Sequence, residues 1–261
     1  MPNLVTACWT MSDVTLGTST TSTRADNLEN IALQADTQLK IRGRATAGAF
    51  SRMLVVPEYY FSAGSSIVSR DDKHRIYQKL KSISASVPDL ILIAGSIAYK
   101  KGIISKDTYN VCPILHNGNI VKKLYKANDD GVHQINGTFK TKNDGGKGVP
   151  VVTINGITIG LDICMDYNNN RLGAYLQANN LNPPDIHVQI SGTNAIGRPS
   201  AQARVGGVYV HCDMGGKGAN GATAWRITAQ NGQAGASSTR IQPFLTLQPG
   251  AGRLIFFDTN V

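Results

Sequence analysis

The chain of 261 residues lacks several patterns that mark whole classes of protein. Its four cysteines are scattered, and no two of them have the CxxC spacing of a zinc site or a redox pair. Such scattering also argues against a disulfide framework, so a reducing compartment is the default expectation. No apolar run is long enough to span a bilayer, and the first residues lack the basic and apolar regions of a signal peptide. We therefore expect a cytoplasmic protein with no membrane partner.

The sequence also lacks a basic tract and a metal-binding pattern. The formal net charge is +9, but lysine and arginine are spread along the chain. The densest basic patch, residues 69–81, contains two aspartates and has Ile76 and Leu80 at i and i+4, which favours a solvated surface helix over a nucleic-acid site. His211, Cys212 and Asp213 are adjacent, so on a strand their side chains would alternate between faces. We expect no metal, no cofactor and no nucleic-acid partner.

What the sequence does contain is an alternation of strands and helices in one domain, residues 1–261. Apolar runs predict early strands, and apolar residues at helical spacing predict helices between them. Asn117-Gly118 and Asn155-Gly156 each separate two such runs and predict tight hairpins. The segments after Cys164 predict one helix followed by several strands. The expected strands are 3–9, 52–58, 89–98 and 183–192, with closing strands in 223–237 and 252–261, and the expected helices are 25–41, 70–85 and 170–180. Residues 200–215 are expected to form a short helix and then a strand. This order is typical of mixed sheets with helices on their outer faces.

Three of these apolar runs end in a reactive side chain. Glu58 ends the run "MLVVPE", Lys126 ends "IVKKLYK" and Cys164 ends "ITIGLDIC". Ligands of α/β sheets bind beyond the carboxyl ends of strands, so we expect the three side chains to meet at one such edge. A carboxylate can take the proton of a thiol, an ammonium can stabilise a thiolate or an oxyanion, and a thiolate can attack a carbon. Cys8, Cys112 and Cys212 are interpreted as packing residues.

The segments around these residues, "VVPEYYF", "GNIVKKLYK" and "GLDICMD", resemble the nitrilase, or carbon–nitrogen hydrolase, superfamily. The segments "LILIAGSIA", "YNVCPIL" and "DIHVQISG" agree with it, so the resemblance covers nearly the whole chain. It implies an α/β fold with a Glu-Lys-Cys triad: a four-layer αββα sandwich of two mixed β-sheets with helices outside. It also implies a homo-oligomer, a dimer or higher, because such sandwiches often pair across subunits.

Carried over residue by residue, the resemblance assigns a role to each motif position. Glu58 would be the general base, Lys126 the triad lysine and Cys164 the nucleophile. The N–H of Met165 would help to bind the oxyanion, and Asp166 would have a structural task. Other residues would line the substrate pocket: Tyr59, Gln134, Ser191, Gly192, Thr193 and Asn194.

The implied activity is cysteine-dependent hydrolysis of a non-peptide carbon–nitrogen bond, in a small amide or nitrile, through a thioester. Ammonia or an amine would leave, as in enzymes of the EC 3.5 type. Many members carry a second glutamate after the triad lysine, whereas this chain has no glutamate between Lys126 and Pro150 and has Gln134 near the expected place. Two alternatives therefore stay open: an amide or acyl transferase of the same fold, and a binding module with weakened chemistry. The polar residues expected in the pocket favour a polar substrate.

Overall fold

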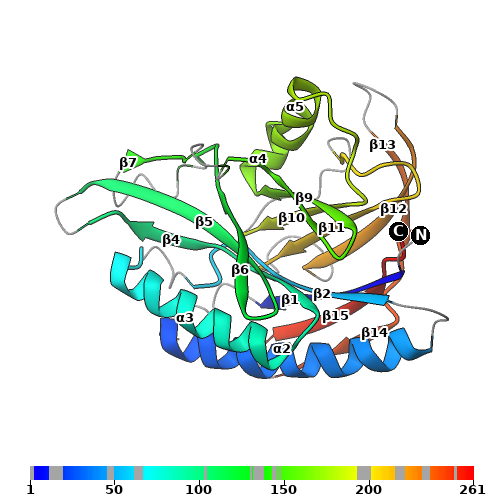
Figure 1. Ribbon diagram of the computed structural model, residues 1–261, viewed down its shortest axis with the longest axis horizontal. Coiled ribbons are helices and arrows are strands. Elements are labelled where there is room, and N and C mark those ends of the chain that lie inside the picture. The colour runs from blue at the N-terminus through cyan, green and yellow to red at the C-terminus, as the bar shows by residue number, and fades with distance from the viewer. Residues whose placement is uncertain are drawn as a thin grey trace.

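Two stacked β-sheets with helices on both outer faces form the architecture (Figure 1). The computed structural model describes residues 3–11, 20–45, 50–61, 67–102, 105–129, 131, 138–142, 146, 148–192, 201–214, 221–230, 236–249 and 252–261. Helices α2 and α3 cover one sheet, and the shorter α4 and α5 lie over the other. The predicted fold class, an α/β sandwich of two mixed sheets with helices outside, is confirmed. Within the described ranges, no helix has the length and apolarity needed to cross a membrane.

The first sheet, here called sheet A, has the strand order β14-β15-β1-β2-β3-β5-β4, with β6 and β7 also paired to β5. Strands β1, β2 and β3 are parallel, and β15 and β5 flank them antiparallel. The strands β1 and β15, which are far apart along the chain, pair with each other in this sheet. The strands are β1 (Asn3–Met11), β2 (Phe50–Val56), β3 (Leu90–Ala94), β4 (Ile97–Lys100), β5 (Asp107–His116), β6 (Asn119–Tyr125), β7 (Thr138–Phe139), β14 (Leu245–Leu247) and β15 (Gly252–Asp258).

The second sheet, sheet B, has the order β13-β12-β11-β10-β9-β8. Its centre is parallel, since β10 pairs in parallel with both β9 and β11, and its edges are antiparallel. The strands are β8 (Val151–Ile154), β9 (Ile157–Ile163), β10 (Ile186–Ser191), β11 (Val208–Asp213), β12 (Ala222–Gln230) and β13 (Ala236–Ile241).

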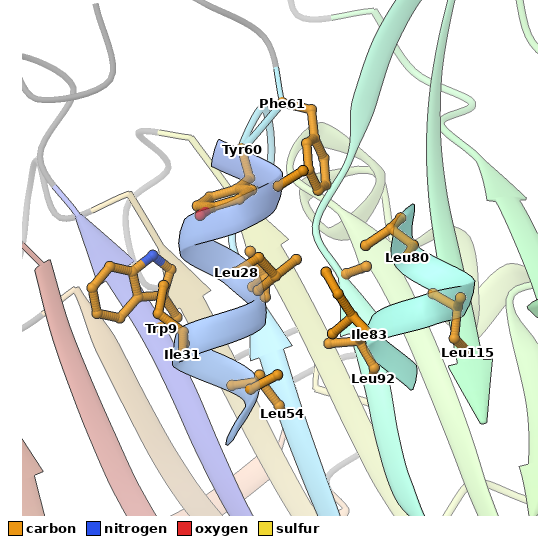
Figure 2. Close-up of a cluster of buried hydrophobic side chains, with 14 of the residues drawn as sticks. Trp9, Leu28, Ile31, Leu54, Tyr60, Phe61, Leu80, Ile83, Leu92 and Leu115 are labelled. Atoms are coloured by element: carbon orange, nitrogen blue, oxygen red, sulfur yellow. The ribbon is translucent and has the colours of Figure 1, made fainter. Parts of the chain in front are cut away.

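Two long helices bury apolar stripes against sheet A. Helix α2 (Thr21–Arg44) and helix α3 (Arg70–Ser86) each begin after a hydroxyl residue, Thr20 or Ser69, whose side-chain oxygen accepts a hydrogen bond from the first turn. Figure 2 shows the resulting core, with side chains from both helices packed on the strands. It includes Trp9, Leu28, Ile31, Leu54, Tyr60, Phe61, Leu80, Ile83, Leu92 and Leu115.

A second apolar core fills the space between the sheets. Its side chains come from alternate positions of strands in both sheets, as the two-residue period of a strand requires. Cys8, Cys112 and Cys212 are fully buried in it, which agrees with their interpretation as packing residues. The two short helices of sheet B, α4 (Met165–Asn168) and α5 (Arg171–Ala178), follow directly on β9.

Both predicted hairpins are confirmed. Asn117 and Gly118 join β5 to β6 with φ of 49° and 76°, and Asn155 and Gly156 join β8 to β9 with φ of 51° and 75°. Two consecutive positive φ values are the requirement of a type I′ turn, which asparagine and glycine meet with little strain.

Two sequence predictions need correction. The expected strand 89–98 is divided into β3 and β4, which both pair with β5 but are separated by Gly95 and Ser96. Gly95 has φ of 72°, and a Cβ there would lie 2.4 Å from the oxygen of Pro57, so the break needs a glycine. The short helix expected before β11 is wrong, since residues 201–207 form turns and irregular structure.

Candidate active site

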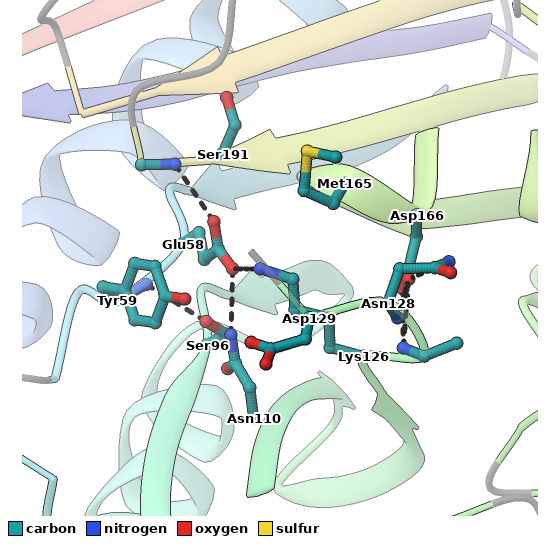
Figure 3. Close-up of polar contacts among 12 residues, drawn as sticks. Glu58, Tyr59, Ser96, Asn110, Lys126, Asn128, Asp129, Met165, Asp166 and Ser191 are labelled. Atoms are coloured by element: carbon teal, nitrogen blue, oxygen red, sulfur yellow. Dashed lines mark hydrogen bonds and ion pairs between the residues drawn. The ribbon is translucent and has the colours of Figure 1, made fainter. Parts of the chain in front are cut away.

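Glu58 lies just beyond the end of β2, in the turn that Pro57 begins, and its side chain is completely buried. Its Oε1 accepts hydrogen bonds from Lys126 Nζ at 2.9 Å and from Asn110 Nδ2 at 2.9 Å. Its Oε2 accepts one from the backbone N–H of Gly192 at 3.2 Å. Figure 3 shows the carboxylate at the centre of these contacts. A buried carboxylate needs such partners, because desolvation penalises its charge.

Lys126 directly follows β6, and its side chain is as deeply buried as that of Glu58. Its ammonium also lies 5.6 Å from the centre of the Tyr59 ring. Asp129 follows Lys126 by three residues and is drawn in the same region of Figure 3. The pair of full charges is therefore enclosed by polar and aromatic groups, a setting in which electrostatic interactions are much stronger than in water.

Asp166 fixes the backbone that follows Lys126. Its carboxylate accepts hydrogen bonds from the N–H groups of Ala127 and Asn128, at 3.0 and 2.8 Å, and from the Asn128 side chain at 2.9 Å. Arg171 adds an ion pair at 2.7 Å. Burial raises the pKa of Asp166 above its ordinary value, while Arg171 and the Asn128 bonds act in the opposite direction. The aspartate thus ties the end of β6 to the start of α4.

Cys164 occupies a sharp turn between β9 and α4, with φ of 50° and ψ of −106°. A residue with a side chain adopts a positive φ only at a cost of about 1–3 kcal/mol, which the surrounding structure must offset. The backbone N–H of Cys164 donates to the oxygen of Ile190 at 2.8 Å. The side chain is 8% exposed. Met165 is the first residue of α4, a position whose N–H has no acceptor within its own helix.

The end of β10 brings these elements together. Ile190 holds the backbone of Cys164, and Gly192, two residues later, holds the carboxylate of Glu58. Two residues of a strand span roughly 7 Å, so the backbone of Cys164 and the carboxylate of Glu58 are held at neighbouring points of the same strand end. Lys126 joins through Glu58, and Asp166 ties its loop to the turn of Cys164. The three strand ends that the sequence singled out are thus adjacent.

Comparisons with known proteins agree on this architecture. No protein-family model matches the chain, and no curated protein matches it in sequence. Among solved structures, an amidase from Nesterenkonia sp. superposes with a TM-score of 0.63, at 16% identity, over 100% of this chain and 90% of the amidase. Nit3 from Saccharomyces cerevisiae, a member of branch 10 of the nitrilase superfamily, superposes with a TM-score of 0.60, at 14% identity, over 99% and 90%. The chain has the nitrilase fold.

One further structure of this fold bears on cysteine chemistry. A glutamate variant of the Nesterenkonia amidase, with a TM-score of 0.63, 14% identity and coverage of 99% of this chain and 93% of the amidase, carries acrylamide added to its active site cysteine. The resemblance inferred from the three motifs is confirmed at the level of the nitrilase fold. The roles of Glu58, Lys126 and Cys164 stay predictions.

Of the other predicted pocket residues, Gly192 lies in the site, because its N–H binds Glu58. The prediction for Ser191 needs correction, because its side chain is bound to His211 and Asp213 on the neighbouring strand. The rest divide into two groups. Tyr59 lies in the site: its N–H donates to Ser96 Oγ at 3.0 Å, and its ring packs beside Gly192, where an added Cβ would lie 3.1 Å from the ring. Gln134, Thr193 and Asn194 lie outside the described residues, so their places in the pocket stay predictions.

Sequence reasoning missed two polar residues that hold the site together, Asn110 and Ser96. Asn110 binds Glu58, and Ser96 binds the backbone of Tyr59; both are completely buried. A signal existed for each, because a polar residue interrupts an otherwise apolar run in "YNVCPIL" and "LILIAGSIA". Among the described residues, no group of three or more histidine, cysteine and acidic side chains is arranged to hold a metal ion.

Proposed function

We propose that this chain is a cysteine-dependent amidase that hydrolyses a small polar amide to a carboxylic acid and ammonia. The observation that carries the proposal is the completely buried Glu58–Lys126 ion pair, 2.9 Å long, beside the strained turn of Cys164. Burying two charges in a soluble fold is expensive, and hydrophobic replacements are often more stable. Buried ionisable groups in close contact are characteristic of functional sites. The nitrilase fold of two structurally similar proteins, one of them an amidase, supports the same chemistry.

In the proposed acylation step, Glu58 accepts the proton of the Cys164 thiol as sulfur attacks the amide carbon. The carbonyl electron pair moves to oxygen, and Lys126 together with the Met165 N–H stabilises the oxyanion. Donors of this kind contribute roughly 3–4 kcal/mol each in related acyl transfer. The oxyanion then collapses, the carbon–nitrogen bond breaks, and Glu58 returns its proton to the leaving nitrogen. Ammonia departs and a thioester remains on Cys164.

In the proposed deacylation step, Glu58 accepts a proton from water as the water oxygen attacks the thioester. Collapse of the second tetrahedral species expels the thiolate and forms the acid. The thiolate recovers the proton from Glu58, so the site returns to its starting state. One carboxylate therefore serves both half-reactions, and no cofactor is required by this scheme.

The test is ammonia release from a panel of small amides and nitriles. With an accepted substrate, Cys164→Ala and Glu58→Gln are expected to lower kcat by at least about a thousandfold, since each removes a group that reacts. Cys8→Ala is the matched control, because it removes another buried thiol far along the chain from the turn at Cys164. Thermal melting of each variant shows whether the fold survives. Activity that persists in Cys164→Ala would overturn the proposal.

A thioester can also be resolved by an amine. Mass spectrometry of the enzyme with substrate is expected to show an acyl adduct on Cys164 that water removes. If the adduct is removed only after hydroxylamine or another amine is added, the protein is a transferase. If no substrate gives an adduct and iodoacetamide alkylates Cys164 no faster than a free thiol, the chain is a binding module.

A further inference from the structure

A second buried polar cluster lies behind the site, on the face of sheet B that points away from sheet A. Ser191, the last residue of β10, places its Oγ 2.7 Å from His211 Nε2 and donates to Asp213 Oδ2 at 2.6 Å. All three side chains are at least 96% buried. Each of the three side chains therefore needs a partner within the protein, and the other two supply it.

Strand register explains why these three side chains meet. In the parallel pair of β10 and β11, Ser191 is opposite Asp213, and Gln189 is opposite His211. Ser191 therefore stands between two side chains of the neighbouring strand that share its face. Burial lowers the pKa of His211 to about 4, so its imidazole is neutral near pH 7. A neutral ring that carries its proton on Nε2 donates to Ser191, and Ser191 in turn donates to Asp213.

The backbone of Ser191 connects this cluster with Glu58. The carbonyl oxygen of Ser191 accepts a hydrogen bond from the N–H of Met214 at 3.2 Å, and the next N–H, that of Gly192, donates to Glu58 Oε2. The same peptide group is thus fixed by its oxygen, by the anchored side chain of Ser191 and by the carboxylate. In Figure 3 the end of β10 at Ser191 lies directly beside Glu58.

We propose that Ser191, held by Asp213 and His211, is a positioning residue that aims the Gly192 N–H at the carboxylate of Glu58. The inference rests on the proposed function, in which Glu58 is the general base. An alanine at position 191 would keep the strand but lose both side-chain anchors, so the peptide that follows would lose its fixed orientation. The ionised form of Glu58 would then have one hydrogen bond fewer, and its titration would move to higher pH.

Other charged groups near Glu58 stay in place in such a variant. Lys126 is bound to its Oε1, and Asp129 follows Lys126 by three residues. Burial, and after it the charge of Glu58, raises the pKa of Cys112, and Cys164 follows β9. His211 and Asp213 lie against the Ser191 hydroxyl. A shift in the titration of Glu58 after a change at Ser191 would therefore report on the Gly192 hydrogen bond.

The kinetic test compares Ser191→Ala with Thr223→Ala on an accepted amide. Thr223 is the matched control, because it is also a buried hydroxyl and is paired with His211 in the antiparallel register of β11 and β12. We expect Ser191→Ala to lower kcat by roughly tenfold to a hundredfold, the cost of a misplaced reacting group, with KM almost unchanged. The acidic limb of the kcat/KM profile is expected to move to higher pH. Thr223→Ala should change neither quantity.

A second measurement needs no substrate. The chain contains only two glutamates, Glu29 and Glu58, so a protein labelled with ¹³C at the glutamate carboxyl carbon gives two signals. Glu29 lies on the surface beside Lys79 and serves as an internal reference. We expect the Glu58 signal to titrate at higher pH in Ser191→Ala, and Asp213→Asn, which keeps an acceptor for the Ser191 hydroxyl, to shift it less.

The outcomes separate the two proposals. If kcat and the Glu58 titration in Ser191→Ala both match those of the wild type, the positioning role is overturned while the amidase stands. If no amide is hydrolysed but the titration shifts, the proposed function fails and the structural link from Ser191 to Glu58 stands. If Ser191→Ala does not fold, Asp213→Leu replaces it, and an unshifted Glu58 signal there overturns the positioning role.

Discussion

The two faces of sheet B are built from the same strands but from opposite kinds of side chain. Toward sheet A the central strands present an apolar set: Leu161, Ile163, Val188, Ile190, Val208 and Val210. On the other face the alternate residues are polar or aromatic: Asp162, His187, Gln189, Ser191, Tyr209, His211 and Asp213. Both sets are almost completely buried. A strand that alternates apolar and polar residues ordinarily has one wet face, so the pattern alone would predict exposure here.

The difference between the faces teaches what each kind of burial accomplishes. The apolar face gains stability from removal of carbon surface from water. The polar face gains little in that way and requires partners, which cross-strand neighbours supply: Asp162 binds His187 at 3.1 Å, and Tyr209 binds Gln189. Such a network restricts each side chain to one orientation. The polar face ends at Ser191, and the next residue, Gly192, binds Glu58. The fixed side-chain orientations of the network therefore extend to the candidate site.

The largest expected effect on stability comes from removing the carboxylate of Asp166, which binds the loop after Lys126 and Arg171. Asp166→Ala should lower the free energy of unfolding by roughly 3–5 kcal/mol, because the nearly buried Arg171 and two backbone N–H groups lose their acceptor. Urea denaturation measures it. Arg75→Ala is the control: it removes the exposed pair with Asp72, expected to contribute at most about 1 kcal/mol. Equal losses in both variants would contradict the view that burial makes the outer polar contacts important.

Removal of an apolar side chain from the inner face should lower stability but leave kcat unchanged. Leu161, which is 1% exposed, lies one residue before Asp162 and points into the core between the sheets. Leu161→Ala should lower the free energy of unfolding by about 2–5 kcal/mol, from lost burial and the cavity left behind. At a temperature where the variant is fully folded, kcat on an accepted amide should stay near the wild-type value. A loss of kcat as large as that of Ser191→Ala would contradict the view that only the polar face of sheet B affects the candidate site.

A smaller effect, confined to acidic pH, is expected from His211. Its folded pKa is about 4 and its ordinary value is 6.5, so between these pH values the unfolded chain binds the extra proton. Stability therefore falls as pH falls through this window, by at most about 3 kcal/mol. In His211→Gln this part of the pH dependence should be absent. Urea denaturation of both proteins across the window measures it, and parallel curves would show that His211 does not titrate as its burial requires.

The predictions from sequence succeeded where the cause is local. Asn117-Gly118 and Asn155-Gly156 specify their own turns, and Ile76 and Leu80 mark the buried stripe of α3 because helical spacing alone places them together. They failed at Gly95 and Ser96, where the break in an apolar run depends on the distant oxygen of Pro57. Asn110 was missed for the same reason: its partner, Glu58, is 52 positions away.

The sequence by itself determined the two long helices, most of the strands, the two hairpins and the identity of the three strand ends that carry reactive groups, since these follow from residue type and short-range spacing. Tertiary structure alone decided that Lys126 touches Glu58, that Asp166 anchors the loop after Lys126, and that Ser191 is fixed by Asp213 and His211. Each of these contacts joins different strands or loops, and no local preference encodes the packing of two sheets that brings them within hydrogen-bonding distance.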